Sequence, residues 1–273
     1  MSINNNEIIH TYVVLAYKES PYLEECIESV LNQDYKSKVL IGTSTDNEYI
    51  RKMADKYNLE VVVNPIKGGG NAVDFDFAWN TGRTELVTIA HQDDTYDKDY
   101  SLEVVKAYKE QPDAQIIFTD YFEIRESLKV YSNKLLIVKR ILLSPLRLRF
   151  WAGSPTIKKS VICLGDSICC PAVTFCKKNI ETNSVFVNDQ LNGNSDWYGW
   201  LQLAKIKGKK FIFVPKSLMG HRVHEDTHTS REINANTRSP QDLIMFEKFW
   251  PKPIAKFINY FYQSSEKSNS IKK

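Results

Sequence analysis

The chain has 273 residues, of which 42% are hydrophobic, 25% charged and 12% aromatic. Such a composition belongs to a folded protein with one large core or two modest ones, and it excludes intrinsic disorder and collagen-like structure. The 36 Lys and Arg residues against 33 Asp and Glu residues give a formal net charge of +3, which is too small to require a nucleic-acid partner.

Cysteine usage and the N-terminal sequence indicate the compartment. The five cysteines lack the paired CxxC spacing of a zinc ribbon, so we expect reduced thiols. The opening MSINNNEIIH has no basic region followed by an apolar stretch, and no window approaches the ~18 apolar residues that a spanning helix needs. These features predict a cytoplasmic protein.

The first half alternates short apolar runs with helical patterns, which is typical of a βαβ fold. A buried strand is expected at residues 12–17, followed by a helix with Ser20 as its N-cap and Pro21 as its first residue. The next elements are a strand at 38–41, a helix at 48–57, a strand at 60–63, a helix from 70 to 78, a strand at 86–90, a helix at 101–110 and a strand at 115–119. Because ligands bind outside the carboxyl ends of parallel strands, the segments after Tyr17, Ile41 and Ala90 should line one crevice.

Residues 129–159 interleave apolar and aromatic residues with basic ones, namely Lys134, Lys139, Arg140, Arg147, Arg149, Lys158 and Lys159. Such a segment can lie on an anionic membrane surface, and a helix on the sheet with its lysines in water explains it equally well. A strand at 171–175, a helix at 196–205, a strand at 211–214 and a polar stretch at 220–230 follow. The tail after Trp250 is aromatic and then basic, and its last ten residues are expected to be disordered.

Two adjacent carboxylates follow the strand expected at 86–90. Asp93 and Asp94 repel one another, so burying them is unfavourable unless a cation or hydrogen-bond donors compensate. A divalent cation would do so, and Mg²⁺ typically uses one or two carboxylates with substrate phosphate oxygens. For these two residues alone, a solvated turn with an aspartate as helix cap is the alternative.

Three of the five histidines, His221, His224 and His228, fall within eight positions. Imidazole is a good ligand for Mn²⁺, Fe²⁺ and Zn²⁺, so one of them could complete a site that begins at the aspartate pair. A polar loop of ordinary histidines is the alternative. These residues also leave a metal-dependent phosphoester hydrolase open.

Two further signals are weaker. Asp196 begins a helical run, where Ser195 or Asp196 as an N-cap is explanation enough. The run Gly68–Gly70 matches neither the P-loop nor the GxGxxG pattern. Lys67 and the glycine amides could meet a phosphate, although a plain turn is the simpler interpretation.

In combination these motifs resemble those of the family 2 glycosyltransferases of the GT-A fold. VVLAYKESPYLEECIESVLNQDY (13–35) resembles the family's opening strand, turn and helix, and IAHQDDTYDKDY (89–100) its Asp-x-Asp-type metal motif. ICCPAVTF (168–175) resembles its acceptor-side strand, SDWYGWLQLA (195–204) the segment with the catalytic base, and LMGHRVHEDTHTS (218–230) its late Arg-x-His motif. The resemblance keeps this order over roughly residues 11–230.

The resemblance implies an α/β fold with a Rossmann-like, mixed but mainly parallel sheet flanked by helices. It divides the chain into a nucleotide-sugar-binding half at 1–125, an acceptor-side half of the same domain at 126–235, and a helical and basic tail at 236–273. It implies Asp196 as general base, and Asp94 and His224 as contacts to Mn²⁺ or Mg²⁺. The residues it places around the nucleotide, with Lys67 added from the phosphate argument, are Ala16, Tyr17, Glu19, Thr43, Ser44, Asp46, Asp93 and Arg222.

The chain departs from the family pattern at two informative places. Ile41-Gly42 stands where many members carry Asp-Asp, so the aspartate that commonly reads the uracil edge is missing. His91 stands where the first Asp of the fuller Asp-x-Asp-Asp form would be. The reduced set of carboxylates suits a metal held by one Asp, the diphosphate and a histidine.

The predicted function is inverting transfer of a sugar, from a nucleotide-sugar donor that we expect to be a UDP-sugar, to a hydroxyl group. Family habit and the basic segments point to a bacterial cell-surface glycan or a lipid-linked acceptor, with peripheral contact at the inner face of the membrane. Asp196 would accept the hydroxyl proton, a role that contributes about 10²–10⁴-fold. The alternatives are the phosphoester hydrolase and a non-catalytic nucleotide-binding scaffold.

Overall fold

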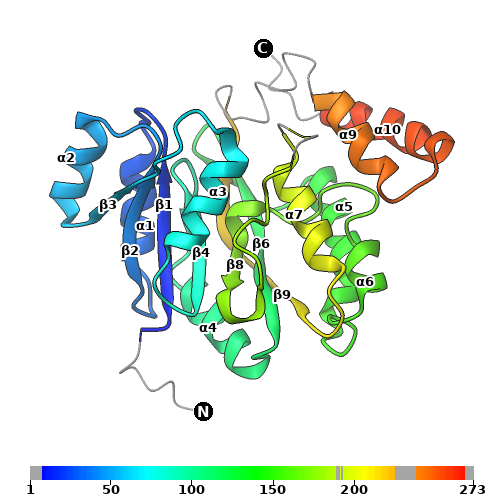
Figure 1. Cartoon of the computed structure of the whole chain (residues 1–273), viewed down its shortest axis with the longest axis horizontal. Coiled ribbons are helices and arrows are strands. Elements are labelled where there is room, and N and C mark those ends of the chain that lie inside the picture. Colours follow the sequence, from blue (N-terminus) through cyan, green and yellow to red (C-terminus); the bar gives the residue numbers. More distant parts are fainter. Residues whose placement is uncertain (1–7, 189–190, 192, 225–237, 268–273) are drawn as a thin grey trace.

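The computed structural model describes residues 8–188, 191, 193–224 and 238–267 (Figure 1). Within these residues the strands are β1 (His10–Ala16), β2 (Lys38–Thr43), β3 (Glu60–Val63), β4 (Leu86–His91), β5 (Thr95–Tyr96), β6 (Ala114–Arg125), β7 (Leu128–Val130), β8 (Val173–Cys176) and β9 (Lys210–Arg222). The helices are α1 (Leu23–Leu31), α2 (Glu48–Tyr57), α3 (Gly70–Thr81), α4 (Tyr100–Glu110), α5 (Lys134–Leu143), α6 (Pro155–Ser160), α7 (Ser195–Ala204), α9 (Arg238–Glu247) and α10 (Lys252–Lys267). His228 and the end of the tail, where disorder is predicted, lie outside the described residues.

The described strands form one sheet in the order β3-β2-β1-β4-β8-β6-β9-β5, with β7 paired to β6 outside that path. The four strands β1 to β4 are parallel, β8 runs antiparallel between β4 and β6, and β6 pairs in parallel with β9. The expected mixed, mainly parallel α/β sheet is therefore confirmed. Leu15 at the end of β1 lies opposite His91 at the end of β4, so the turns that follow both strands open at one edge of the sheet.

Several expected boundaries are wrong: β6, for example, ends at Arg125 and not at 119. Two further differences have a clear physical reason. Helix α1 begins at Leu23, not at Pro21, because Ser20 closes a turn in which its carbonyl accepts from the Leu23 N–H at 3.3 Å. Strand β9 continues to Arg222, well beyond the expected end at 214. The apolar run stops at 214, but pairing with the long strand β6 resumes after a register shift and carries the strand through Gly220.

The core packs stacked aromatic rings on one face of the sheet and hydrogen-bonded tyrosines on the other. On one face the rings of Trp79 from α3, Phe175 from β8 and Trp200 from α7 stack at centroid distances of 5.9 and 6.0 Å. On the other face Tyr96 and Tyr100 pack edge to face, at 4.9 Å. Their hydroxyls donate to the carbonyls of Pro171, at 2.7 Å, and Ala172, at 2.9 Å. These two bonds fix the turn that leads into β8.

A buried carboxylate organises the loop that leads to α7. Asp76 on α3 accepts hydrogen bonds from the backbone N–H groups of Val185, at 2.7 Å, Phe186 and Val187, and from the side chain of Ser184. Backbone donors can satisfy a buried carboxylate without a cation. Asp76 thereby connects α3 with the segment that places Asp196.

Three of the eight basic residues in the 129–159 segment have partners within the protein. Arg140 pairs with Asp120 at 2.8 Å, and Arg149 pairs with Glu110. Lys158 is fully buried and donates to three backbone carbonyls at and after the end of α7, those of Leu203, Ile206 and Lys209. This reduces the charge that the segment can offer to a membrane.

Two further expectations concern the cysteines and membrane spans. All five cysteines are free, as expected. Of the helices in the described ranges, none is both long enough and apolar enough to cross a membrane.

Candidate active site

A cavity of about 630 Å³ opens at the carboxyl ends of β1 and β4. Its walls include the turn after β1, the ends of β4 and β9, the first turns of α3 and α7, the segment before β8, and parts of α5 and β6. In Figure 1 this edge lies at the top of the sheet, because β1 rises from the N-terminus at the bottom. The lining residues on which the chemistry depends are Tyr17, Glu19, Asp74, His91, Asp93, Lys139, Asp166, Asp196, His221, Arg222 and His224.

The turn after β1 is fixed by a side chain from the end of β4. The Gln92 amide accepts from the Tyr17 N–H at 2.9 Å and donates to the Tyr17 carbonyl at 3.1 Å. Lys18 then takes a positive φ of 54° and donates its N–H to the hydroxyl of Thr45. Tyr17 and Glu19 are held at the rim of the cavity by these contacts.

Asp93 and His224 form a pair on one wall of the cavity. The Nε2 atom of His224 lies 3.1 Å from Oδ2 of Asp93, and the imidazole packs against the Tyr22 ring at 5.1 Å. Burial alone would raise the pKa of Asp93, but the hydrogen bond to His224 and the fields of His91 and His221 hold that pKa below its usual value. Asp93 is therefore ionised.

Asp94 has a different environment from its neighbour. Its side chain is fully buried and is not among the residues that line the cavity. One oxygen accepts from the Arg222 N–H at 2.9 Å and lies 3.1 Å from Nδ1 of His221, while Oδ2 has no hydrogen-bond partner. Burial would lower the pKa of His221, but the Asp94 charge raises it above the usual value. Asp94 thus joins the end of β4 to β9.

Arg222 joins three elements. Its guanidinium donates to the Asp93 carbonyl at 3.0 Å and to the Glu25 carboxylate at 2.5 Å, and it lies 4.4 Å above the Tyr22 ring. A guanidinium with these partners is largely satisfied by the protein itself. Arg222 lines the cavity, as expected for a nucleotide contact, and also fixes α1 against β4 and β9.

Asp196 lies in the first turn of α7, where its Oδ1 atom accepts from the Trp197 N–H at 2.9 Å. The helix begins at Ser195 and its N-cap is Asn194, so neither Ser195 nor Asp196 is the cap that the alternative interpretation required. The carboxyl group lines the cavity.

Asp166 is the functional candidate that the sequence did not reveal. It lines the cavity and hydrogen-bonds the side chain of Asp196. Burial and then the nearby Asp196 charge raise the pKa of Asp166 well above its usual value, although Lys139 and Arg238 act in the opposite direction. Two carboxyl groups in contact share one proton. Asp166 is therefore the member of the pair that holds a proton.

Five residues predicted to bind the nucleotide do not line the cavity; they are Ala16, Thr43, Ser44, Asp46 and Lys67. Asp46 is instead held by two hydrogen bonds of 2.7 Å from Arg51. Ser44 donates to Asp74 at 2.8 Å, and Asn64 donates to the same carboxylate at 2.8 Å. Asp74 does line the cavity, so the segment after β2 reaches the site through this α3 residue, for which the sequence held no motif.

The family assignment follows from a family model that matches more than half of the chain. The model of the family described as Glycosyl transferase family 2 matches residues 11–180. The chain belongs to glycosyl transferase family 2. No curated protein sequence matches the chain significantly.

Solved structures agree with the family in fold. TarS 1–349 of S. aureus in complex with UDP-GlcNAc is 13% identical with a TM-score of 0.59, over 92% of this chain and 70% of that one. The mannosyltransferase PcManGT of Pyrobaculum calidifontis, in complex with GDP-Man and Mn²⁺, is 16% identical with a TM-score of 0.61, over 98% and 76%. Glucosyl-3-phosphoglycerate synthase of Mycobacterium tuberculosis, with Mn²⁺ and UDP-glucose, is 14% identical with a TM-score of 0.54, over 85% and 76%. This family 2 chain therefore has the GT-A-like fold.

Proposed function

We propose that this family 2 chain transfers a sugar from a nucleotide-sugar donor to an acceptor hydroxyl, with inversion at the anomeric carbon. The observation that carries the proposal is one cavity with two carboxylate sites: Asp93 beside His224, and Asp196 beside Asp166, whose pKa is raised. The family assignment favours transfer over a phosphoester hydrolase or a non-catalytic scaffold.

Asp196 is the proposed general base. The acceptor oxygen attacks the anomeric carbon from the face opposite the nucleoside diphosphate, and its proton moves to the Asp196 carboxylate. The bond from the anomeric carbon to the diphosphate oxygen breaks as the new bond forms. The leaving group departs as a stable anion, so no second carboxylic acid is needed to protonate it, in contrast to a glycosidase.

The pair formed by Asp93 and His224 suits a divalent metal ion. Asp93 and His224 supply one carboxylate and one imidazole, and within the described ranges no group of three or more potential ligands is preassembled. The remaining ligands would come from the diphosphate and water, as is usual for Mg²⁺ and Mn²⁺ at phosphate sites. The bound ion would neutralise charge on the departing diphosphate.

We propose Asp93, in place of Asp94, as the carboxylate ligand. Asp93 faces the cavity, whereas both partners of Asp94 Oδ1 belong to β9 and its side chain is closed off from solvent. An imidazole ligand favours Mn²⁺ over Mg²⁺. Asp94 then supports the site by fixing the strand end that leads to His224.

We propose UDP as the nucleotide, with Asp74 as the carboxylate available to the base. Uracil presents an N–H donor, and Asp74 lines the cavity on the β2 side, oriented by Ser44 and Asn64. A fixed carboxylate is a good acceptor for such a donor. Tyr17 and Glu19 at the rim complete the proposed nucleoside wall.

A hydroxyl of a cell-surface glycan or of a lipid-linked saccharide is the proposed acceptor, reached at the inner face of the membrane. Two helices on the right of Figure 1 expose apolar side chains, Ile137 and Ile141 on α5, and Phe257 and Tyr260 on α10. Exposed apolar helix faces with flanking lysines favour an anionic lipid surface.

Thermal unfolding with nucleoside diphosphates tests the donor site. UDP with Mn²⁺ should stabilise the wild type by mass action, and UDP with Mn²⁺ should have little effect on Asp93→Asn. Stabilisation by GDP or CDP, but not by UDP, would show that the donor carries that other nucleotide. If no nucleoside diphosphate stabilises the protein with or without Mn²⁺, the proposed function is overturned.

A further inference from the structure

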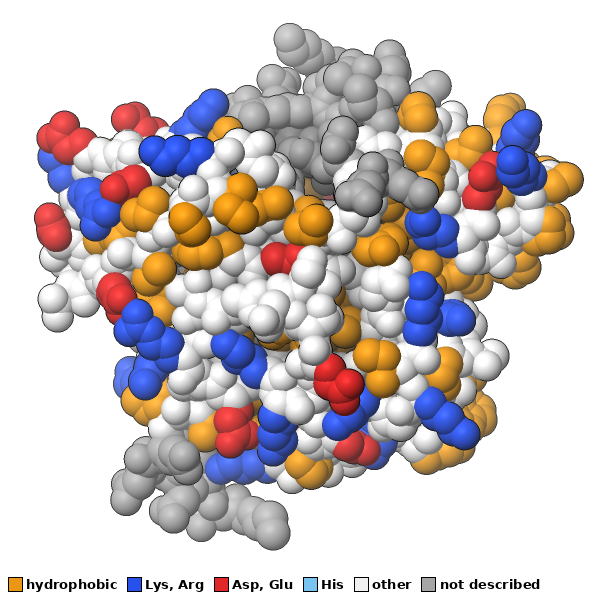
Figure 2. Space-filling view, in the orientation of Figure 1, with side chains coloured by type: hydrophobic (Ala, Val, Ile, Leu, Met, Phe, Trp, Pro, Cys, Tyr) orange, Lys and Arg blue, Asp and Glu red, His pale blue; other side chains and the backbone are white. Residues whose placement is uncertain are grey.

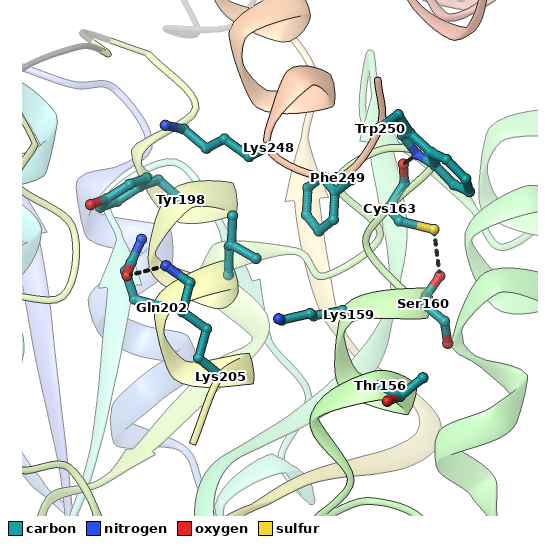
Figure 3. Close-up of a pocket in the computed structure, with 11 residues that line it drawn as sticks. Thr156, Lys159, Ser160, Cys163, Tyr198, Gln202, Lys205, Lys248, Phe249 and Trp250 are labelled. Atoms are coloured by element: carbon teal, nitrogen blue, oxygen red, sulfur yellow. Dashed lines mark hydrogen bonds between the residues drawn. The ribbon is translucent and has the colours of Figure 1, made fainter. Parts of the chain in front are cut away.

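A second cavity, of about 620 Å³, lies between α6, α7 and the junction of α9 with α10 (Figure 3). It shares no lining residue with the candidate active site. Helix α7 separates the two: Asp196 in its first turn faces the active site, whereas Tyr198 and Gln202 line the second cavity. A helix of 10 residues spans about 15 Å, so the second cavity lies within reach of a chain-like molecule that enters the first.

The lining of the second cavity is basic. It contains Lys159, Lys205 and Lys248, and no Asp or Glu is among the described residues that line it. Figure 3 shows Lys159 extending from α6 toward α7, where the Lys205 ammonium donates to the neutral amide of Gln202 at 2.9 Å. Figure 2 shows basic side chains gathered on this part of the face, on the right below α10.

These lysines repel one another. Burial and then the charges of Lys159 and Lys248 lower the pKa of Lys205. Lys158, the buried lysine of this region, is saturated by three carbonyls and offers nothing to a ligand. Lys159 and Lys205, with no carboxylate among the described residues that line their cavity, favour a bound anion.

The same cavity carries flat apolar surface. Tyr198, Phe249 and Trp250 line it, and the indole N–H of Trp250 is fixed by donation to the Cys163 carbonyl at 2.8 Å. The Lys248 ammonium lies 5.6 Å from the centre of the Tyr198 ring. Rigid rings next to a few charged groups are the usual lining of a small-molecule site. A simple phosphate ion would leave these rings unused.

We propose that the second cavity binds an anionic sugar unit, in which a phosphate or carboxylate meets Lys159 and Lys205 and the carbon face of the ring packs on Tyr198 and Phe249. Its use as an outlying site for an acidic acceptor glycan rests on the proposed transferase function, whereas the binding itself does not. The class of ligand is therefore a phosphorylated or acidic saccharide.

The experiment titrates the full-length protein with glucose 6-phosphate, inorganic phosphate and glucose by calorimetry. Glucose 6-phosphate should bind more tightly than either other probe, and Lys159→Gln/Lys205→Gln should weaken it by about tenfold or more, because hydrogen bonds to charged groups are lost. The matched control, Lys109→Gln/Lys207→Gln, removes the same charge from exposed positions outside the lining and should bind as the wild type does.

Two further variants separate the parts of the proposal. Tyr198→Ser should weaken glucose 6-phosphate binding and leave inorganic phosphate binding unchanged. Asp93→Asn should leave glucose 6-phosphate binding intact, and the lysine double variant should keep the UDP and Mn²⁺ thermal shift, so this site and the active site fail independently. Equal losses in both double variants, or inorganic phosphate bound as tightly as glucose 6-phosphate, would overturn the proposal.

Discussion

The two cavities on either side of α7 differ in charge: the candidate active site is lined by carboxylates and cations together, whereas the described lining of the second cavity has lysines and no carboxylate. In the candidate active site, Asp93, Asp166 and Asp196 come from three separate segments, and the protein offsets their repulsion with the His224 bond and with a proton on Asp166. In the second cavity, Lys159 and Lys205 lie near one another, and Lys205 donates to the neutral amide of Gln202. The first site is thus suited to bind a cation and to accept a proton, and the second is suited to bind an anion.

The largest expected effect is the loss of turnover when the proposed base, Asp196, is replaced. Asp196→Asn keeps the shape and most hydrogen bonding but removes the basic group, so turnover should fall by about 10²–10⁴-fold. Donor affinity should barely change, because Asp196 does not hold the diphosphate. Calorimetric UDP affinity and turnover of a UDP-sugar, measured on the same preparation, check this.

The control for that comparison is Asp166→Asn. It mimics the protonated carboxyl group and should preserve turnover near neutral pH, because Asp166 already carries the proton there. Turnover of Asp196→Asn at the wild-type rate would exclude Asp196 as the base.

The next effect distinguishes the two adjacent aspartates. Asp93→Asn should abolish the Mn²⁺ dependence of UDP binding and leave the melting temperature close to that of the wild type. Asp94→Asn should retain the Mn²⁺ dependence but lower stability by about 1–3 kcal/mol, because it weakens buried bonds to His221 and Arg222. Thermal unfolding with and without UDP and Mn²⁺ measures both. The reverse pattern would make Asp94 the ligand, as the sequence alone implied.

A third comparison uses two histidines in opposite surroundings. His10 is fully buried between Ser37 and Thr88 with no carboxylate partner, and burial lowers its pKa to about 3. Since the unfolded chain takes up this proton near pH 6.5, His10 contributes stability above that pH that is lost as pH falls toward 3, at most about 4–5 kcal/mol. His221 has a raised pKa, so its contribution is present below pH 6.5 and is lost as pH rises through the folded value.

Urea unfolding at several pH values tests the His10 effect. In His10→Gln the unfolding free energy should decline less between pH 6.5 and 4 than in the wild type. In His221→Gln this decline should be unchanged. A decline of equal slope in His10→Gln and the wild type would assign the acid sensitivity to other groups.

The smallest expected effect concerns membrane binding by the basic segment at 129–159. Arg140 and Arg149 pair with carboxylates and Lys158 is buried, whereas Lys134 is exposed and available to lipid. Lys134→Gln should weaken binding to anionic vesicles by about 1 kcal/mol at low salt. Lys52→Gln on α2 is the matched control. Equal partitioning of the wild type onto neutral and anionic vesicles would remove the electrostatic contribution.

The sequence by itself determined what depends on neighbours within a turn or a strand. Hydrophobic periodicity and capping residues predicted α2 and β3 at their observed bounds, and β4 to within one residue. The motifs around Asp93 and Asp196 identified the family, and both residues line the predicted edge of the sheet.

Only the tertiary structure decided what each polar group contacts. Asp94 is closed off by Arg222, 128 positions away, and Asp166 meets Asp196 across a strand and a loop. The extension of β9 likewise depends on its partner β6, since its own residues after 214 show no apolar pattern. Burial and proton sharing depend on distances through space, and spacing along the chain does not encode them. For the same reason the lysine cavity could not be predicted, because its lining comes from helices separated by about 90 positions in the sequence.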